Sequence, residues 1–471
     1  MKTIEKGGLI YEKKKKLWKD FLCCDNILFV YPNEEKFSGS DFMKYNFNKE
    51  RISEGTEICN ITADGFKSAC VSVNFVLPLS EKASLFALVP NVLMRSSEKY
   101  ADFTEIEKKL ALLYGAELVA DVSKTGEHHV LRMAVSCIDD RFAFDGESIS
   151  AECAELLFEL IFKPRLENGT FTQNVVESEK RLLSERLFAE DSDKRIYAKN
   201  RCEEIMFSEE TYGIHRLGTK AMVNAITSKT LYSAYKEMLE TAKIVVCVSG
   251  NADYDAVKNL ATGYLSAINR KAEIGETVFI ERADEVKYTK ETEEVKQGKL
   301  VMGFRMGMKD VQDNYAARRI MVELFGGSPH SKLFMNVREK MSLCYYCSAR
   351  MIRAKGIMFV QSGIESYNEE KAKNAILQQL EDIKNGDFTD GDIEYSVKAL
   401  EDSFKSVTDS PESLDSWFMS QCVSGNYNYP EDFIDDFKKV TREDIIKAAQ
   451  SVTLDTVFML EGTAKDGESD E

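Results

Sequence analysis

The stretches NGTFTQNVVESEKRLLSERL (168–187) and NGDFTDGDIEYSVKALEDSF (385–404) are two versions of one pattern, and they decide the fold. Both begin with Asn-Gly, place Phe-Thr directly after, and continue as a segment in which Glu and Leu recur at equivalent places. A pattern that returns so far along a chain indicates internal duplication. The rest of each half should then recur in the same order.

Three further pairs of segments do recur in that order. Each half therefore contains a strand, a helix, more strands, two or more helices and a closing strand. Because strands and helices segregate instead of alternating strictly, we predict an α+β sandwich for each half. The pairs are VSVNFVLPLS (71–80) with LVMGFRMGMK (300–309), LYGAELVADVSKTGEHHVLRMAVSCI (113–138) with LCYYCSARMIRAKGIMFVQSGI (343–364), and IVVCVSGNA (244–252) with TVFMLEGTA (456–464).

The duplication divides the chain into four predicted parts. The start of the chain has no counterpart in the second half, and a charged segment with few core residues separates the halves. The parts are an N-terminal extension (1–55), a first domain (56–265), a linker (266–290) and a second domain (291–471).

The composition is that of an acidic globular protein. The chain has 471 residues, of which 44% are apolar, and a formal charge of −17. That charge argues against general affinity for nucleic acid or for an anionic membrane. The lysine run between Glu12 and Lys19 is expected to be a solvated face. No segment reaches the roughly 18 consecutive apolar residues of a membrane span, and the N-terminus has no apolar stretch suited to a secretory signal.

The cysteines indicate a reducing compartment. There are 11 of them, scattered along the chain, as expected for free thiols in a cytoplasmic protein. Cys344 and Cys347 form a lone CxxC. Without a second pair this spacing gives only weak support for zinc, so we interpret the two residues as buried thiols.

One predicted helix of the first half contains a proline. In ASLFALVPNVL (83–93) apolar residues recur at helical spacing. Pro90 falls inside this segment, where proline removes a backbone donor and costs roughly 3 kcal/mol. We therefore expect a kinked helix.

Two segments resemble a known family. FGGSPHSKLFMNVREKMSLCYYCSA (325–349) is similar to the pattern of paired Gly, Ser-x-Leu-Phe, Val-Arg-Glu and Leu-x-Tyr in the second domain of peptidase family M16, the insulinase or pitrilysin-like family. YGIHRLGTKAMVNAITSKTLYSAYKEML, which begins at Tyr212, looks like the Tyr-Gly…Gly segment of the first domain. Together with the duplication, the resemblance extends from about residue 56 to the end and implies two homologous α/β sandwich domains.

The resemblance also implies a lost metal site. Active members carry His-x-x-Glu-His on the first helix of domain one, where the two histidines share a zinc ion and the glutamate activates the metal-bound water. The matching positions hold Ala87, Pro90 and Asn91. A third ligand position, on a later helix, matches Glu185, but a single carboxylate does not hold zinc. We therefore expect no metal ligands, no cofactor, no catalytic residue and no peptidase activity of the chain by itself.

The four histidines do not restore the site. His128 and His129 are adjacent at the start of a predicted strand and so point to opposite faces. Neither these two nor His215 and His330 form a two-histidine helical pair, and we expect surface or loop positions for all four.

The second half keeps residues that the resemblance connects with substrate. Arg338 in VREK and Tyr345 in LCYY match an arginine and a tyrosine that, in the family, hydrogen-bond the substrate and can stabilise the oxyanion at the site of the opposite domain. The alternatives are a helix-face ion pair for Arg338 and a core position for Tyr345. We predict Arg338 and Tyr345 as substrate-binding residues.

The resemblance finally implies a partner. Bacterial members of this length form dimers of half-shells around a closed chamber, and in heterodimers a degenerate chain accompanies a zinc-bearing one. The first hypothesis is therefore a cytoplasmic, non-catalytic subunit that binds unfolded peptide together with a zinc-bearing M16 partner. The chain particularly resembles inactive M16 subunits of Firmicutes, some of which are associated with the aminopentanol modification of elongation factor P.

Two alternatives stay open. One is a peptide- or protein-binding scaffold without a peptidase partner, in elongation factor P modification or elsewhere. The other is a hydrolase with a relocated metal or nucleophile, which the few histidines and the absence of a motif such as Gly-x-Ser-x-Gly disfavour.

Overall fold

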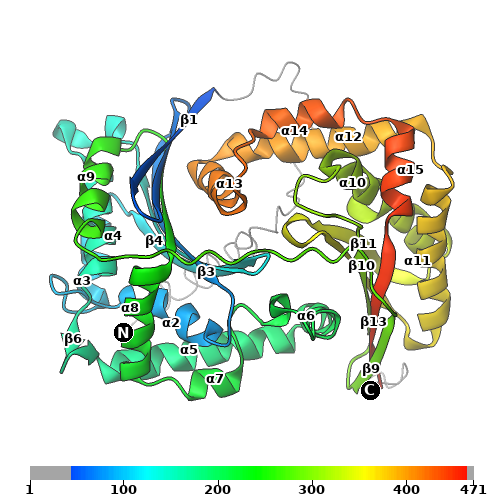
Figure 1. The fold of residues 1–471 in the computed structure, drawn as a ribbon, viewed down its shortest axis with the longest axis horizontal. Coiled ribbons are helices and arrows are strands. Elements are labelled where there is room, and N and C mark those ends of the chain that lie inside the picture. The colour runs from blue at the N-terminus through cyan, green and yellow to red at the C-terminus, as the bar shows by residue number, and fades with distance from the viewer. Residues whose placement is uncertain (1–43, 464–471) are drawn as a thin grey trace, which may run out of the picture.

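Two β-sheets that face each other dominate the computed structural model, which describes residues 44–463 (Figure 1). Helices cover the outer side of each sheet, and two helices lie between the sheets. The lysine run near the N-terminus lies outside the described residues. Within the described part of the chain, no helix has the length and apolar character needed to cross a membrane.

The strands form a six-stranded sheet, a five-stranded sheet and a short ribbon. The first sheet contains, in spatial order, β1 (Tyr45–Ser53), β2 (Thr56–Ala63), β8 (Lys243–Ser249), β3 (Ser68–Pro78), β5 (His128–Ile138) and β4 (Glu117–Thr125). The second contains β11 (Cys344–Ile352), β12 (Ile357–Ile364), β10 (Gly298–Arg305), β13 (Thr453–Gly462) and β9 (Lys287–Glu293), and the ribbon pairs β6 (Leu166–Glu167) with β7 (Thr170–Phe171).

The α-helices fall into two series that repeat the predicted order. They are α2 (Ala83–Leu93), α3 (Phe103–Leu112), α4 (Ile149–Phe162), α5 (Gln173–Ser192), α6 (Lys194–Met206), α7 (Lys220–Asn224), α8 (Ser228–Thr241) and α9 (Tyr254–Leu265) in the first half, and α10 (Tyr315–Val322), α11 (Glu369–Lys384), α12 (Asp390–Lys405), α13 (Pro411–Ser424), α14 (Pro430–Phe437) and α15 (Arg442–Gln450) in the second.

The first sheet has an apolar core on each face. In β8, Ile244 and Val246 belong to the large core beneath the outer helices, whereas Val245 and Cys247 belong to a separate cluster on the other face. Successive side chains of a strand point to opposite faces, so a strand that is apolar throughout is buried on both. The second cluster is completed by Met419, which α13 of the second half contributes.

The second sheet is built in the same way. Leu300 and Met302 of β10 face the outer core, and Val301 between them faces a cluster that contains Cys202 and Met206. These last two residues belong to α6, a helix of the first half.

The halves thus exchange helices. α6 follows the first copy of the duplicated segment and α13 follows the second, so the two helices are equivalent. α6 contacts β10 and β13, while α13 contacts β3 and β8, and both lie between the sheets in Figure 1. The predicted fold class, α+β with two homologous sandwich domains, is confirmed.

A buried charge accompanies α13. Asp415 is fully buried and accepts hydrogen bonds from Arg132 Nη2 at 2.8 Å and Ser72 Oγ at 2.7 Å, both on the first sheet. Burial raises the pKa of the Asp415 carboxyl, and Arg132 opposes that shift. The pair helps to fix the position of α13 on the sheet, together with apolar contacts and a hydrogen bond from Lys243 Nζ of β8 to the Cys422 carbonyl at 2.8 Å.

Charges also join the hairpin turns of the two halves. Lys355, between β11 and β12, is fully buried, and its ammonium group contacts Glu127 of the β4–β5 turn and, at 2.8 Å, Glu210. Glu210 also accepts from Arg305 at 2.7 Å, and Arg305 contacts Asp455 at the same distance. A carboxylate of the first half is therefore shared by two cations of the second.

Two strands connect the segments that the sequence separates. β9 begins inside the predicted linker and pairs parallel with β13, and β1 lies in the predicted N-terminal extension and pairs antiparallel with β2. The division into four parts stays a prediction.

We expect Asp415→Asn to lower the free energy of unfolding by about 3 kcal/mol, because it deprives the largely buried Arg132 of this counter-ion. Urea unfolding followed by circular dichroism measures the change. Asp436→Asn is the matched control, since Asp436 is exposed on α14 and pairs with the exposed Lys439. It should change the stability by less than about 0.5 kcal/mol. Equal effects of the two substitutions would contradict the role given to Asp415.

Candidate functional site

The helix that would present a metal in the first half holds no ligands. α2 continues through Pro90 as one helix to Leu93, so the proline does not end it. Ala87 and Pro90 are buried, and the Asn91 side chain donates from Nδ2 to the Ala87 carbonyl at 3.1 Å. The one polar side chain among the three positions is thus bonded to the backbone of its own helix.

The carboxylate of α5 that approaches the end of α2 is Glu179, not Glu185. The Glu185 side chain is 58% exposed and pairs with Arg181 at 3.0 Å along its own helix. Glu179 is buried and contacts Arg95 Nε at 2.6 Å, directly beyond the end of α2. The helical spacing of Val176, Glu179 and Leu183 is the sequence signal for this inward face.

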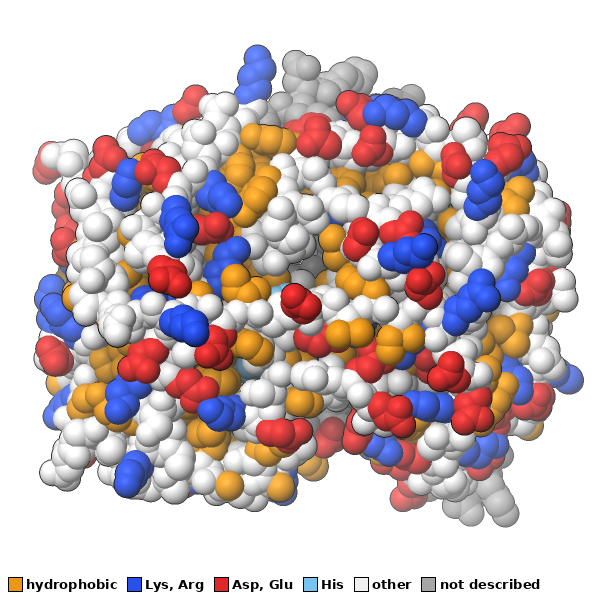
Figure 2. All heavy atoms as spheres, viewed as in Figure 1, with side chains coloured by type: hydrophobic (Ala, Val, Ile, Leu, Met, Phe, Trp, Pro, Cys, Tyr) orange, Lys and Arg blue, Asp and Glu red, His pale blue; other side chains and the backbone are white. Residues whose placement is uncertain are grey.

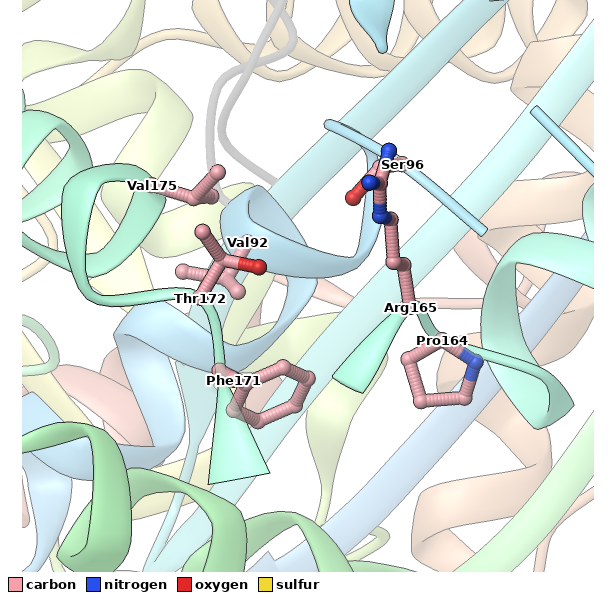
Figure 3. Close-up of a pocket in the computed structure, with 7 residues that line it drawn as sticks. All are labelled: Val92, Ser96, Pro164, Arg165, Phe171, Thr172 and Val175. Atoms are coloured by element: carbon pink, nitrogen blue, oxygen red, sulfur yellow. The ribbon is translucent and has the colours of Figure 1, made fainter. Parts of the chain in front are cut away.

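A pocket beside the end of α2 is equally unsuited to a metal (Figure 3). It has no room for a water molecule, and none of its lining residues is His, Cys, Asp or Glu. The lining residues are Val92, Ser96, Pro164, Arg165, Phe171, Thr172 and Val175. Across residues 44–463, no cluster of three or more His, Cys, Asp or Glu side chains could hold a metal ion.

An ion-pair cluster that sequence reasoning missed lies near the start of α2. Glu190, at the end of α5, contacts Arg216 at 2.6 Å and His215 Nε2 at 3.2 Å. His215 Nδ1 accepts from the Leu217 N–H, and Nε2 lies 3.2 Å both from Glu190 and from Arg216 Nη1. Burial would raise the pKa of Glu190, but His215 and Arg216 lower it to about 2. Ser84 of α2 bonds the Leu217 carbonyl and so holds this loop against the helix.

The expectation of surface positions is wrong for two histidines. His128 is buried and its ring nitrogens lie 3.1 Å from the Thr125 carbonyl and 2.8 Å from that of Gly275. His129 is fully buried, packs edge-on to Phe86 of α2 with the ring centroids 6.4 Å apart, and has its pKa lowered by burial to about 4. The β5 strand starts inside the core, which adjacency in sequence does not reveal.

A second buried carboxylate connects β4 with the exchanged helix α6. Glu203 of α6 lies between Lys124 of β4 and Lys199 of its own helix. Burial would raise the pKa of Glu203, but the two lysines lower it to about 2. Lys124 also donates to the carbonyls of Tyr212 and Ile214, so this group supports the loop that carries His215.

Arg338 and Tyr345, the predicted substrate-binding residues, lie on exposed positions of the second half. Arg338 belongs to η5 (Leu333–Lys340), is 39% exposed, and lies 4.4 Å over the Phe334 ring and 3.6 Å from Glu339. Tyr345 is 54% exposed on β11, and its hydroxyl donates to Glu365. Tyr345 is thus not a core residue, and the Arg338 ion pair is long and solvated. Their role in binding stays a prediction.

A family model and a named relative both match this chain, and their descriptions agree. A family model described as the peptidase M16 inactive domain matches residues 225–400. The chain is 33% identical over 405 residues to the Bacillus subtilis (strain 168) protein named "Probable inactive metalloprotease YmfF", covering 86% of this chain and 95% of that protein.

Solved structures share the fold. A conserved protein from Enterococcus faecalis V583 superimposes with a TM-score of 0.83 at 26% identity, covering 90% of this chain and all of that one. A peptidase M16 inactive domain from Pseudomonas fluorescens superimposes with a TM-score of 0.69 at 14% identity, covering 90% and 99%. The two-domain architecture inferred from the duplication is therefore that of these structures.

The lowered pKa values of Glu190 and Glu203 predict acid sensitivity. An unfolded glutamate titrates near about 4.3, so the stability these carboxylates provide is complete above about pH 5 and is lost as the pH falls towards about 2. In Glu203→Gln, the loss of unfolding free energy between pH 5 and pH 3 should shrink by on the order of 1 kcal/mol.

Urea unfolding at the two pH values measures this difference. The neighbouring Glu204→Gln is the matched control, because the Glu204 side chain is mostly exposed. It should keep the pH dependence of the original chain. If Glu203→Gln keeps it too, Glu203 is not a source of the acid sensitivity.

Proposed function

This chain belongs to the peptidase M16 family, and we propose that it is a non-catalytic subunit of a heterodimeric M16-type zinc peptidase. The chain is not a peptidase by itself. One observation carries the proposal: the first half lacks ligands at Ala87, Pro90 and Asn91, while the second half presents Arg338 and Tyr345 at its surface. A chain that serves another chain's metal site needs exposed side chains that can bind substrate, and it needs no metal ligands of its own.

The chemistry of Arg338 suits this role. A guanidinium group has five N–H donors, and one carboxylate at 3.6 Å occupies few of them. Stacking over Phe334 restricts the side chain without consuming donors. Arg338 can therefore donate to a peptide carbonyl and to the oxyanion that develops when water attacks it. Tyr345 would add a hydroxyl group and an aromatic face for an extended peptide.

The remaining surface agrees with a peptide and a protein partner better than with nucleic acid. On the face shown in Figure 2, acidic and basic side chains are interspersed, and the net charge is −17. The nine described cysteines are all free, as expected in the cytoplasm, which is the compartment we propose. The association with elongation factor P rests on resemblance alone and stays a prediction.

The test is reconstitution with an M16 chain from the same cell that carries an intact His-x-x-Glu-His. We expect Arg338→Ala to lower turnover of an unstructured peptide by the complex about 100-fold, since one lost oxyanion donor costs roughly 100- to 1,000-fold. Size-exclusion chromatography should show the complex intact, because Arg338 would contact substrate and not the partner.

Arg181→Ala is the matched control, an exposed arginine that pairs along α5, and should leave turnover unchanged. Unchanged turnover in Arg338→Ala would remove the role given to Arg338. Failure of the two chains to associate would favour the scaffold alternative.

A further inference from the structure

A β-bulge in β11 brings two cysteines to one face of the strand. Along β12, Cys344 pairs with Ile364, Tyr346 with Gly363 and Cys347 with Ser362. Tyr345 has no partner in this ladder and is therefore the inserted residue. Residues three apart on a regular strand point to opposite faces. The inserted residue restores the alternation, and Cys344 and Cys347 therefore lie side by side.

The surroundings of Cys344 differ from those of the other cysteines. Within residues 44–463, Cys344 alone is half-buried and the other eight cysteines are buried. A hydrogen bond from Cys347 is the main cause that lowers the pKa of Cys344, with Ser362 and the charge of Arg338 adding to it and burial opposing it. The prediction of two buried thiols is correct for Cys347 and wrong for Cys344.

The other buried thiols have the opposite character. Cys59 and Cys422 lie with their sulfur atoms 3.5 Å apart between β2 and α13, yet both are fully buried, and the pKa of each is raised well above its usual value. Thiolates attack disulfides and buried thiols do not, so proximity alone does not make a reactive pair. Cys344 differs from these buried thiols because it is accessible to solvent and the positive charge of Arg338 lies nearby.

We propose that Cys344 and Cys347 form a redox-active dithiol that exchanges with low-molecular-weight disulfides, with Cys344 as the attacking thiolate and Cys347 as the resolving thiol. The site is independent of a peptidase partner, because all of its residues belong to the second half of this chain. Arg338 stabilises the attacking thiolate, which connects the oxidation state of the pair with the surface proposed to bind peptide.

The exchange proceeds in two balanced steps. The Cys344 thiolate attacks a disulfide RSSR, a bond forms between Sγ and one sulfur, and RS⁻ leaves. Cys347 then loses its proton and attacks Cys344 Sγ, which forms the Cys344–Cys347 disulfide and releases the second RS⁻. The external disulfide is reduced to two thiols, and the protein dithiol is oxidised by the same two electrons.

The strand geometry permits this disulfide. The two cysteines span two steps of the partner strand, so their Cα atoms lie roughly 6.6 Å apart. That is close to the upper limit of about 6.8 Å for disulfides. The separation therefore lies within the range in which a disulfide can form.

The test uses the full chain with Cys23→Ser and Cys24→Ser, so that cysteines outside the described residues do not react. The probe is 5,5′-dithiobis(2-nitrobenzoate) in equimolar amount with the folded protein. We expect release of about two thionitrobenzoate ions per chain and a Cys344–Cys347 disulfide in the peptide map. Adding Cys347→Ser should halve the release and leave the nitrobenzoate adduct on Cys344.

Cys344→Ser should slow the release at least about tenfold. Cys422→Ser is the matched control, a buried thiol next to another cysteine, and should react like the background chain. Circular dichroism checks folding. Should a serine variant not fold, the peptide map of the background chain decides, since it must show the Cys344–Cys347 disulfide. Labelling elsewhere than Cys344, or two ions released in Cys347→Ser, would overturn the proposal.

Discussion

The reciprocal packing of α6 and α13 is the contact on which the rest of the structure depends. The central strands of each sheet are apolar on both faces, and the inner face of each sheet is covered by a helix from the other half. Neither half could bury its own strands alone. The charges that accompany these helices, Asp415 with Arg132 and Glu210 with Lys355 and Arg305, restrict the packing to one arrangement, because each needs its partner when buried.

This packing constraint explains how the fold persists in a chain without the zinc ligands of the family's active members. The helix that presents zinc in active members serves the core here: Ala87 and Pro90 are buried, and Asn91 bonds its own backbone. The residues at the positions of the zinc ligands can change, as long as the helix still fills its place in the core beside the sheet. The surface of the second half is under no such burial constraint, and the binding role of the exposed Arg338 stays a prediction.

The sequence predicted the architecture because duplication is visible as recurring letters. The expectation of no metal ligands rests on the residue types at Ala87, Pro90 and Asn91. Sequence reasoning missed what depends on packing. Glu185 matched the family position, but the side chain that approaches α2 is Glu179, since helix rotation and not alignment decides the inward face. The burial of His129 and the bulge at Tyr345 depend on neighbouring strands, which a single segment does not encode.

The most direct test of the central claim is a native mass spectrum, with zinc quantified, of this protein purified from its own cells. The account predicts a one-to-one complex with a second chain of similar size, carrying one zinc ion that stays with the partner when the chains are separated. Stoichiometric zinc on this chain alone would contradict the assignment of an empty first-half site, and a metal-free homodimer would contradict the assignment of a peptidase subunit.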